Sequence, residues 1–290
     1  MQKVAVLGAN GFIGSPIADA FSGLGWEVVS FARSALSNSG WEEYSVDLFD
    51  EESLMHAVAF SKPDVVISTA WDTKHGKFWT SEFNDSYRYA TLRFAEICFD
   101  AGVKTFVGLG TMSEYGMSPG FCNAAVSPLI DNDIYSKSKI ETGVELKKIG
   151  EKFGRQTHWA RVFQAFGPNE KSERYIPGLI ANLKNGSKFS IRTPNFEMDW
   201  IHTSDVASAI VFMIQNQLNH FVDIGTGVGT TVKELSELIC EELDLDSSLL
   251  DYSGQVPGHQ KKAVVDKQTQ LLSLGWQPTE SLRNRIKSLG

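Results

Sequence analysis

The chain has 290 residues, of which 42% are hydrophobic and 21% charged, a balance typical of a folded globular protein rather than a disordered one. Its net charge of −8 comes without a dense cluster of lysines and arginines, which argues against a nucleic-acid surface, because phosphates need neutralising cations. No stretch reaches about 18 apolar residues, so we expect neither a membrane span nor a signal peptide. Cys98, Cys122 and Cys240 are too widely spaced for a disulfide framework or a metal site, which predicts buried thiols in a cytoplasmic protein without a bound metal.

Short apolar runs alternate with helical stretches in the N-terminal half of the sequence. The runs are uniformly apolar, which indicates strands buried on both faces of a parallel sheet. Each helical stretch ends at a glycine or proline break. The expected strands are residues 4–7, 28–31, 65–68 and 106–109, and the expected helices are residues 15–23, 51–59 and 86–101. This alternation predicts right-handed βαβ units and a Rossmann-type, doubly wound α/β fold.

The sequence after residue 156 continues with a core strand at 157–162 and then changes in character. We expect helices at residues 177–185, 206–214 and 233–242, and a late strand at 221–224. No flexible linker separates the two halves. We therefore expect a dinucleotide-binding domain over residues 1–165 that carries the catalytic residues. Residues 166–290 would form a smaller α/β substrate-binding lobe, from which segments near 200–225 return to the core.

Three glycines, Gly8, Gly11 and Gly14, follow the first strand and open the first helix. The spacing G-x-x-G-x-x-G differs by one residue from the dinucleotide fingerprint G-x-G-x-x-G. In both patterns the glycines permit a tight turn and close backbone approach, and the helix N-terminus offers free N–H groups to a pyrophosphate. A tight turn with no ligand is the alternative reading.

The end of the second strand indicates which dinucleotide binds. An NAD site normally has an acidic residue there for the ribose 2′-hydroxyl, whereas an NADP site lacks it and supplies an arginine. Ala32 stands at that position and is followed by Arg33 and Ser34, which favours NADP over NAD. Arg33 could also be an ordinary surface residue. Asp47 could reach the adenine amino group or equally close a turn.

Tyr135 and Lys139 form a Y-x-x-x-K motif. Positions i and i+4 share one face of a helix, so both side chains can point at one ligand. A cation beside a phenol lowers the pKa of the phenol from about 10, which suits a general acid/base for a hydroxyl or carbonyl oxygen. Thr111 follows the strand at 106–109 and can supply a hydroxyl to the same place.

These motifs and several later stretches together resemble the extended short-chain dehydrogenases/reductases, the NAD(P)-dependent epimerase/dehydratase family that acts on nucleotide sugars. Residues 113–116 resemble the family's stretch ending in Tyr-Gly, and residues 161–168 its R-x-x-N-x-Y-G-P strand end. Residues 199–207 resemble D-[FW]-[IV]-H-V-x-D-V-A, and Pro257-Gly258 to Asp266 resembles its C-terminal signature. The similarity covers nearly the whole chain.

The resemblance implies a role for each matching residue. Tyr135 would be the acid/base, Lys139 would hold the nicotinamide ribose, and Thr111 would hydrogen-bond the reacting oxygen. The expected cofactor contacts are Gly8, Asn10, Gly11, Phe12, Ile13, Gly14, Arg33, Ser34, Asp47, Leu48, Thr69, Ala70, Trp71, Tyr135 and Lys139. The expected substrate contacts are Trp71, Thr111, Ser113, Gln164 and Lys261. The family also implies a homodimer. His202 would be a packed histidine, and Asp205 the N-cap of the next helix.

Departures from the family pattern bear on the substrate and the reaction. Gln164 replaces the usual Asn, Met198 replaces a common Arg, and Trp71 stands in a turn where small residues are commoner.

A dehydratase needs an acid beside the catalytic Thr. Met112 occupies that position, and Glu114 comes one residue late, so that on extended backbone it would face away. We therefore expect an NADP(H)-dependent reductase of a nucleotide-linked 4-keto(-6-deoxy) sugar. The alternatives are a nucleotide-sugar 4-epimerase with bound NAD, a reductase of a small non-sugar carbonyl compound, and a non-catalytic NADP-binding sensor.

Overall fold

The computed structural model describes residues 2–34, 40–72, 74, 76–116, 118–256 and 261–290. Pro257 and Gly258 of the C-terminal signature lie outside this range. The strands are β1 (Lys3–Leu7), β2 (Glu27–Ala32), β3 (Glu42–Ser45), β4 (Val65–Ser68), β5 (Thr105–Thr111), β6 (Gly120–Cys122), β7 (Gln156–Val162), β8 (Gln164–Phe166), β9 (Phe189–Ser190), β10 (Glu197–His202), β11 (Phe221–Ile224), β12 (Gly229–Thr231), β13 (Leu250–Asp251) and β14 (Lys262–Val265). The α-helices are α1 (Gly14–Gly23), α2 (Glu51–Ser61), α3 (Phe83–Asp100), α4 (Ile134–Phe153), α5 (Tyr175–Lys184), α6 (Thr203–Gln215), α7 (Val232–Glu242), α8 (Gln270–Ser273) and α9 (Leu282–Lys287). Short 3₁₀ helices are η1 (Phe78–Thr80), η2 (Met112–Tyr115) and η3 (Ser247–Leu249).

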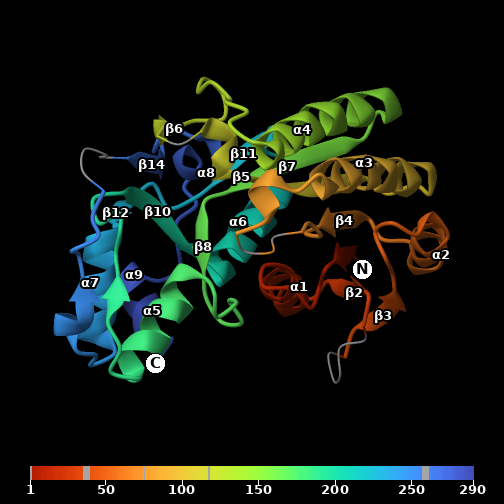
Figure 1. The fold of residues 1–290 in the computed structure, drawn as a ribbon. Helices are drawn as coiled ribbons and strands as arrows, with labels where there is room; N and C mark the ends of the chain where they lie inside the picture. Colours follow the sequence, from red (N-terminus) through yellow and green to blue (C-terminus); the bar gives the residue numbers. More distant parts are fainter. Residues whose placement is uncertain (1, 35–39, 73, 75, 117, 257–260) are drawn as a thin grey trace.

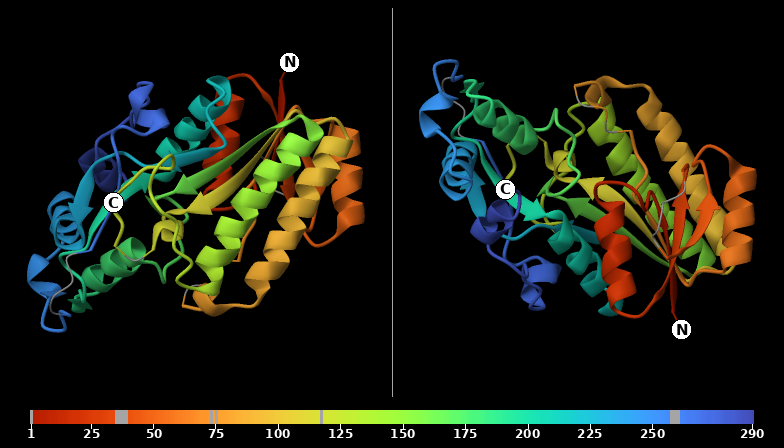
Figure 2. Two further views of the ribbon diagram at one scale, coloured as in Figure 1. Left: turned by 90° about the horizontal axis from the view of Figure 1, so that it is seen from above. Right: turned by 90° about the horizontal axis from the view of Figure 1, so that it is seen from below.

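Seven parallel strands form the main sheet in the order β11-β7-β5-β4-β1-β2-β3. Helices α1 and α6 cover one face and α2, α3 and α4 cover the other (Figures 1 and 2). The buried faces explain why the strands read as continuous apolar runs. The order reverses between β1 and β4, which is where a doubly wound sheet binds its ligand. This confirms the predicted Rossmann-type fold.

A second sheet follows the order β12-β10-β14-β6, with β8 pairing β10. Helices α5, α7 and α9 pack with it around a separate apolar core (Figure 1). Strand β11 lies in the main sheet although it follows β10 in the sequence. The division of the chain into two domains at residue 165 stays a prediction.

Local capping explains where the helix that carries Tyr135 starts and stops. The Asp133 side chain accepts a hydrogen bond from the Ser136 N–H at 2.7 Å, and the Ser136 hydroxyl reaches back to Asp133. Gly154, in the left-handed conformation, ends the helix. Tyr135 and Lys139 therefore stand in the first two turns of α4, next to the sheet.

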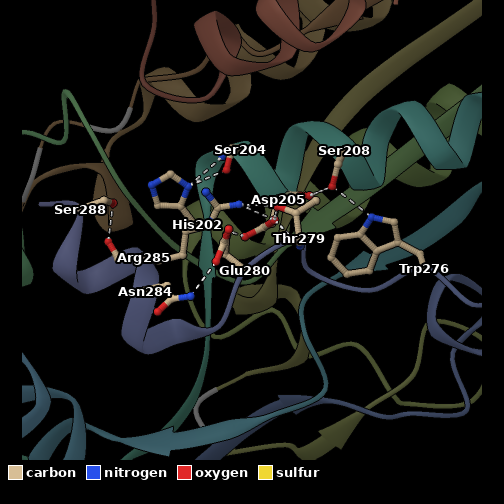
Figure 3. Close-up of polar contacts among 10 residues, drawn as sticks. All are labelled: His202, Ser204, Asp205, Ser208, Trp276, Thr279, Glu280, Asn284, Arg285 and Ser288. Carbon is tan, nitrogen blue, oxygen red and sulfur yellow. Dashed lines mark hydrogen bonds and ion pairs between the residues drawn. The ribbon is translucent and has the colours of Figure 1, made fainter.

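Asp205 does not cap α6, so that expectation is wrong. The N-cap is His202, which is buried as expected, and its Nδ1 accepts from the Ser204 N–H at 3.3 Å. Asp205 lies in the first turn of the helix and binds Arg285 of α9, 2.9 Å away, together with the backbone and hydroxyl of Thr279 (Figure 3). A carboxylate in the first turn suits the helix dipole, but its partner comes from the other end of the chain.

Among the described residues, no helix is long and apolar enough to cross a membrane. Within the same part of the chain, no group of three His, Cys, Asp or Glu side chains is arranged to hold a metal ion. Cys98, Cys122 and Cys240 are free and buried, as the sequence predicts.

Candidate active site

The glycine turn forms a close-packed cradle at the carboxyl end of β1. Gly8 has a φ of +87°, which favours glycine, and a Cβ on Gly14 would collide with the Gly8 carbonyl oxygen. The Thr69 hydroxyl, from the end of β4, donates to the Leu7 carbonyl at 2.9 Å and lies against Gly8. Within the described part of the chain, no side chain caps the start of α1, and no acidic residue stands in its first turn. This helix start therefore fits an anionic group such as a pyrophosphate.

The remaining residues of the turn differ in exposure, and their expected contact with a cofactor stays a prediction. Phe12 and Ile13 are partly buried against the core, and the exposed Asn10 donates to the Ser34 hydroxyl at 3.2 Å. That contact brings the glycine turn beside the segment after β2. Arg33 is exposed there, directly after the last residue of the strand.

Asp47 closes a turn, because its carboxylate accepts from the Phe49 N–H at 2.9 Å. Leu48 is buried in the core, so its side chain is engaged by the protein itself. Burial raises the pKa of Tyr87, with further upward effects from Asp72 and Asp47 and a downward effect from Arg33. Tyr87 therefore marks a place where the charges of three segments converge.

Tyr135, Lys139 and Thr111 are brought together at the carboxyl end of β5. Both α4 side chains are buried, and the Lys139 ammonium donates to the Leu109 carbonyl of β5 at 2.7 Å. Burial raises the pKa of Tyr135 above its ordinary value, and hydrogen bonding with Thr111 opposes the rise. The expectation of a lowered phenol pKa is thus not met, because desolvation has the largest effect on it; the Lys139 Nζ lies 5.8 Å from the ring centroid. Burial also lowers the pKa of Lys139 to about 7, and Glu114 opposes that shift.

Thr111 is the last residue of β5, and its extended backbone makes it the N-cap of the 3₁₀ helix η2, which begins at Met112. Its hydroxyl accepts from the Ser113 N–H and donates to the Ser113 hydroxyl, both at 3.3 Å, so Ser113 adjoins Thr111 as expected. Glu114 does not face away on a strand, as the sequence suggested. The turn of η2 directs it inward, where it accepts from the Thr111 N–H at 2.9 Å and completes a capping box.

Glu114 belongs to a buried polar network beneath the site. Its other contacts are the Trp159 indole N–H at 3.0 Å and the Arg161 Nε at 2.7 Å. Arg161 also donates to the Tyr115 hydroxyl, which donates to Asp223 at 2.6 Å. Burial raises the pKa of Asp223 to about 6. Glu114 is therefore occupied as a structural acceptor.

The Trp159 indole fills a space that three glycines leave open. A Cβ on Gly108 or Gly110 of β5, or on Gly143 of α4, would come within 2.7 Å of this indole. The main sheet and α4 thus meet across one aromatic ring. These glycines could have been noticed in the sequence, but their shared partner could not.

Gln164 and Lys261 are less closely tied to this cluster. Gln164 pairs in register with Trp200 where β8 meets β10, and it is half-buried. The Lys261 carbonyl accepts from the Glu197 N–H at 2.8 Å, at the start of β14. Met198 is buried in the second core, so it offers no replacement for an arginine at a ligand surface.

The sequence analysis missed the ion pair of Arg174 and Glu170, whose arginine acts on Tyr135. Arg174 precedes α5 and is close enough to lower the pKa of Tyr135. Its Nε lies 3.6 Å from the Glu170 carboxylate, whose second oxygen is buried without a hydrogen-bond partner. Burial raises the pKa of Glu170 to about 7. Neither residue stands in a recognised motif, so only the fold brings them here.

Known proteins of similar sequence and fold act on nucleotide sugars. The chain is 24% identical to UDP-glucose 4-epimerase of Rhizobium meliloti, over 97% of this chain and 94% of that protein. It is 25% identical to dTDP-6-deoxy-L-talose 4-dehydrogenase (NAD(P)(+)) of Kitasatospora kifunensis, over 99% and 94%. The solved structure of UDP-glucose 4-epimerase from Thermotoga maritima with UDP-glucose superposes with a TM-score of 0.86 at 22% identity, covering 99% of this chain and 96% of the other.

The model of the NAD dependent epimerase/dehydratase family matches residues 4–225, which include the glycine turn, Thr111, Tyr135 and Lys139. This match spans the main sheet from β1 to β11. The chain belongs to the NAD dependent epimerase/dehydratase family.

Proposed function

We propose that this protein is an NADP(H)-dependent reductase of a nucleotide-linked 4-keto sugar, such as a 4-keto-6-deoxyhexose. The observation that carries the proposal is that the Glu114 carboxylate is already hydrogen-bonded within the protein. This is the acidic residue that follows Thr111, and its carboxylate is bound by a backbone N–H, an indole and a guanidinium. Among the described residues, the Thr111 hydroxyl interacts with the hydroxyls of Ser113 and Tyr135, which suit proton transfer to a carbonyl oxygen rather than elimination.

Three residues would carry the chemistry. Thr111 hydrogen-bonds the substrate oxygen and stabilises the alkoxide that develops on it. Tyr135, whose raised pKa keeps it protonated at neutral pH, donates the proton to that oxygen. Lys139 holds the nicotinamide ribose beside them. The bound dinucleotide supplies the hydride.

The residues present fit a dinucleotide. The Gly8–Gly14 cradle leaves no room for a Cβ, and the uncapped start of α1 accepts a pyrophosphate. Arg33, exposed at the end of β2 where no acidic residue follows the strand, supports a 2′-phosphate and hence NADP. The name of the Kitasatospora relative, a 4-dehydrogenase that uses NAD(P)(+), supports redox chemistry at the same sugar carbon.

A second candidate is a 4-epimerase that keeps its NAD. The relatives from Rhizobium and Thermotoga are named as UDP-glucose 4-epimerases, and epimerisation needs no acid beyond Tyr135. The two functions differ in net consumption of reduced cofactor.

The test is to mix purified protein with NADPH and a dTDP- or UDP-linked 4-keto-6-deoxy sugar, and to follow absorbance at about 340 nm. We expect NADPH consumption and a slower rate with NADH. Interconversion of two UDP-sugars without net oxidation, together with NAD retained on the purified protein, would instead establish the epimerase. Tyr135→Phe should lower the rate by a factor of about 10² to 10⁴ while cofactor binding persists, which separates an enzyme from a sensor.

We also propose that the protein is a homodimer through α3 and α4. These helices lie side by side on one face of the sheet (Figures 1 and 2). They leave Phe83, Tyr89 and Val144 exposed. Light scattering on the eluting protein should give twice the mass of the chain, and Tyr89→Glu should shift it toward the monomer.

A further inference from the structure

Aromatic residues between β4 and α3 contact the two residues of α4 expected to be catalytic. Its first aromatic residue, Trp71, places its indole ring 3.6 Å from the Lys139 Nζ, measured to the ring centroid. This distance is well inside the range of about 6 Å over which a ring face attracts a cation. Small residues are commoner at this point in the family that the sequence resembles, so a tryptophan here is a departure from that pattern.

Trp71 is held in place by a buried amide. Its indole N–H donates to the Asn84 side-chain oxygen at 2.8 Å, and its ring stacks on Tyr87 with centroids 5.6 Å apart. Asn84 is 1% exposed. Its amide nitrogen donates to the carbonyls of Phe78 and Ser81 at 2.7 and 2.8 Å, so three hydrogen bonds fix it.

The same amide fixes the aromatic residues beside Tyr135. Phe78 and Trp79 belong to the turn that Asn84 holds, and their rings lie 4.8 and 5.5 Å from the ring of Tyr135. One buried side chain thus joins the aromatic contact on Lys139 to the aromatic contacts on Tyr135. Such a fixed arrangement costs little reorganisation when a ligand binds.

Lys139 needs a stabilising partner for its charge. Among the described residues, no carboxylate forms a salt bridge with it. The groups that face it are the Leu109 carbonyl of β5, the Trp159 ring of β7 at 5.5 Å, Tyr135 one turn earlier on α4, and Trp71. Glu114 of η2 acts on it from a greater distance, while burial favours the neutral amine.

We propose that Trp71, fixed by Asn84, is a positioning residue whose indole keeps the Lys139 ammonium charged and oriented in the site. For its catalytic consequence this inference rests on the proposed function, in which Lys139 holds the cofactor ribose. The contact itself belongs to the protein alone and can be tested without turnover.

The experiment is NMR on protein labelled with ¹³C-lysine, with the Lys139 Hε–Cε signal assigned by its loss in Lys139→Met. In the wild-type protein, the ring current of Trp71 should place this signal upfield of the other lysines. In Trp71→Leu, the signal should return toward ordinary positions, and the midpoint of its titration should fall by about 0.5 to 1 pH unit. In Trp71→Phe, which keeps an aromatic ring face, the midpoint of the Lys139 titration should fall by less.

Trp79→Leu is the matched control, because it removes an indole from the same segment that contacts Tyr135 instead of Lys139. It should leave the titration of Lys139 where it is. An equal shift in both variants would mean general loosening of the segment and would overturn the proposal, as would an unshifted midpoint in a folded Trp71→Leu protein.

Should Trp71→Leu not fold, the wild-type spectrum still decides, because an Hε signal at ordinary positions contradicts the contact. The failure of the proposed function is seen separately. A ketosugar that is not reduced leaves the titration result intact. Conversely, if the protein reduces the ketosugar but the titration of Lys139 does not respond to Trp71→Leu, only this inference is overturned. In an active enzyme, the pH profile of kcat should shift with the NMR midpoint.

Discussion

Two ion pairs in this protein each join a carboxylate to an arginine that is distant in the sequence, but the two pairs stabilise different parts of the structure. Glu114 and Arg161 lie under the candidate active site with 0% and 2% of their side chains exposed. Asp205 and Arg285 join the start of α6 to α9, with 3% and 18% exposed (Figure 3). The first pair also holds the backbone of Thr111, whereas the second also holds Thr279.

The difference in burial between the two pairs indicates which structural role each pair can have. A fully buried pair carries a large desolvation cost, which only a complete set of hydrogen bonds offsets, so it suits a place that must not move. A partly exposed pair keeps some of its hydration, so it can hold a C-terminal segment in place at a lower desolvation cost. We therefore expect the first pair to affect both stability and rate, and the second to affect stability alone.

The largest effect is expected from Glu114→Ala. This substitution leaves the buried Arg161 guanidinium without its carboxylate partner and removes the acceptor of the Thr111 and Trp159 N–H groups. The free energy of unfolding should fall by about 3–5 kcal/mol, measured by urea denaturation. Glu114→Gln, which keeps the shape but loses the charge, is the control and should cost less. A loss below about 1 kcal/mol in the alanine variant would contradict a buried charged pair.

Asp205→Ala should cost less, about 2–3 kcal/mol, because Arg285 can regain water. Its kcat should match that of the wild-type protein under conditions where both are folded. A double-mutant cycle with Arg285→Ala measures the coupling between the two side chains. A fall in kcat without unfolding would show that the two pairs are not functionally distinct.

Lys139→Met tests the opposite case, a buried charge without a salt bridge. The folded protein lowers the pKa of Lys139 from 10.5 to about 7, so the unfolded chain binds more protons between these values. The cost of this lysine is therefore full below about pH 7 and fades as the pH rises toward 10.5. The variant should be more stable by about 1–2 kcal/mol at neutral pH, with turnover lost. The expectation fails if the gain is as large at about pH 10 as at about pH 6.

The smallest effect is expected from acid titration of His220, which joins β7 to α4 through the Gly143 carbonyl at 2.8 Å. Burial lowers the pKa of His220 from 6.5 to about 4, so its stabilising contribution is present above 6.5 and lost as the pH falls toward 4. Wild-type protein should lose about 1 kcal/mol through this group between about pH 7 and pH 5. His220→Gln should flatten that part of the stability profile. If stability falls equally steeply with decreasing pH in both proteins, groups other than His220 cause the loss of stability in acid.

Several features could be predicted from the sequence because they depend on neighbours in the chain. The apolar runs predicted the strands of the parallel sheet, and the glycine spacing predicted the turn after β1. The Y-x-x-x-K spacing placed Tyr135 and Lys139 on one helix face. Each of these depends on backbone geometry over a few residues.

Other features could not be predicted in this way. Glu114 was expected on extended backbone, and Asp205 was expected at a helix N-cap. Glu114 turns inward because η2 begins directly after Thr111, and Asp205 falls inside α6 because that helix begins at Thr203. Each carboxylate then binds a distant guanidinium, Arg161 at a separation of 47 residues and Arg285 at a separation of 80. Local propensity is a weak guide where a charge has to be buried.

The sequence by itself determined the fold class, the glycine turn after β1 and the placement of a phenol and an ammonium on one helix, since short-range spacing is enough for these. Only the tertiary structure decided the surroundings of that pair: the Trp159 ring between sheet and helix, the occupied Glu114, and the indole of Trp71 over Lys139. The physical reason is that burial and pKa depend on every segment that packs against a group, and those segments meet only when the whole sheet has formed.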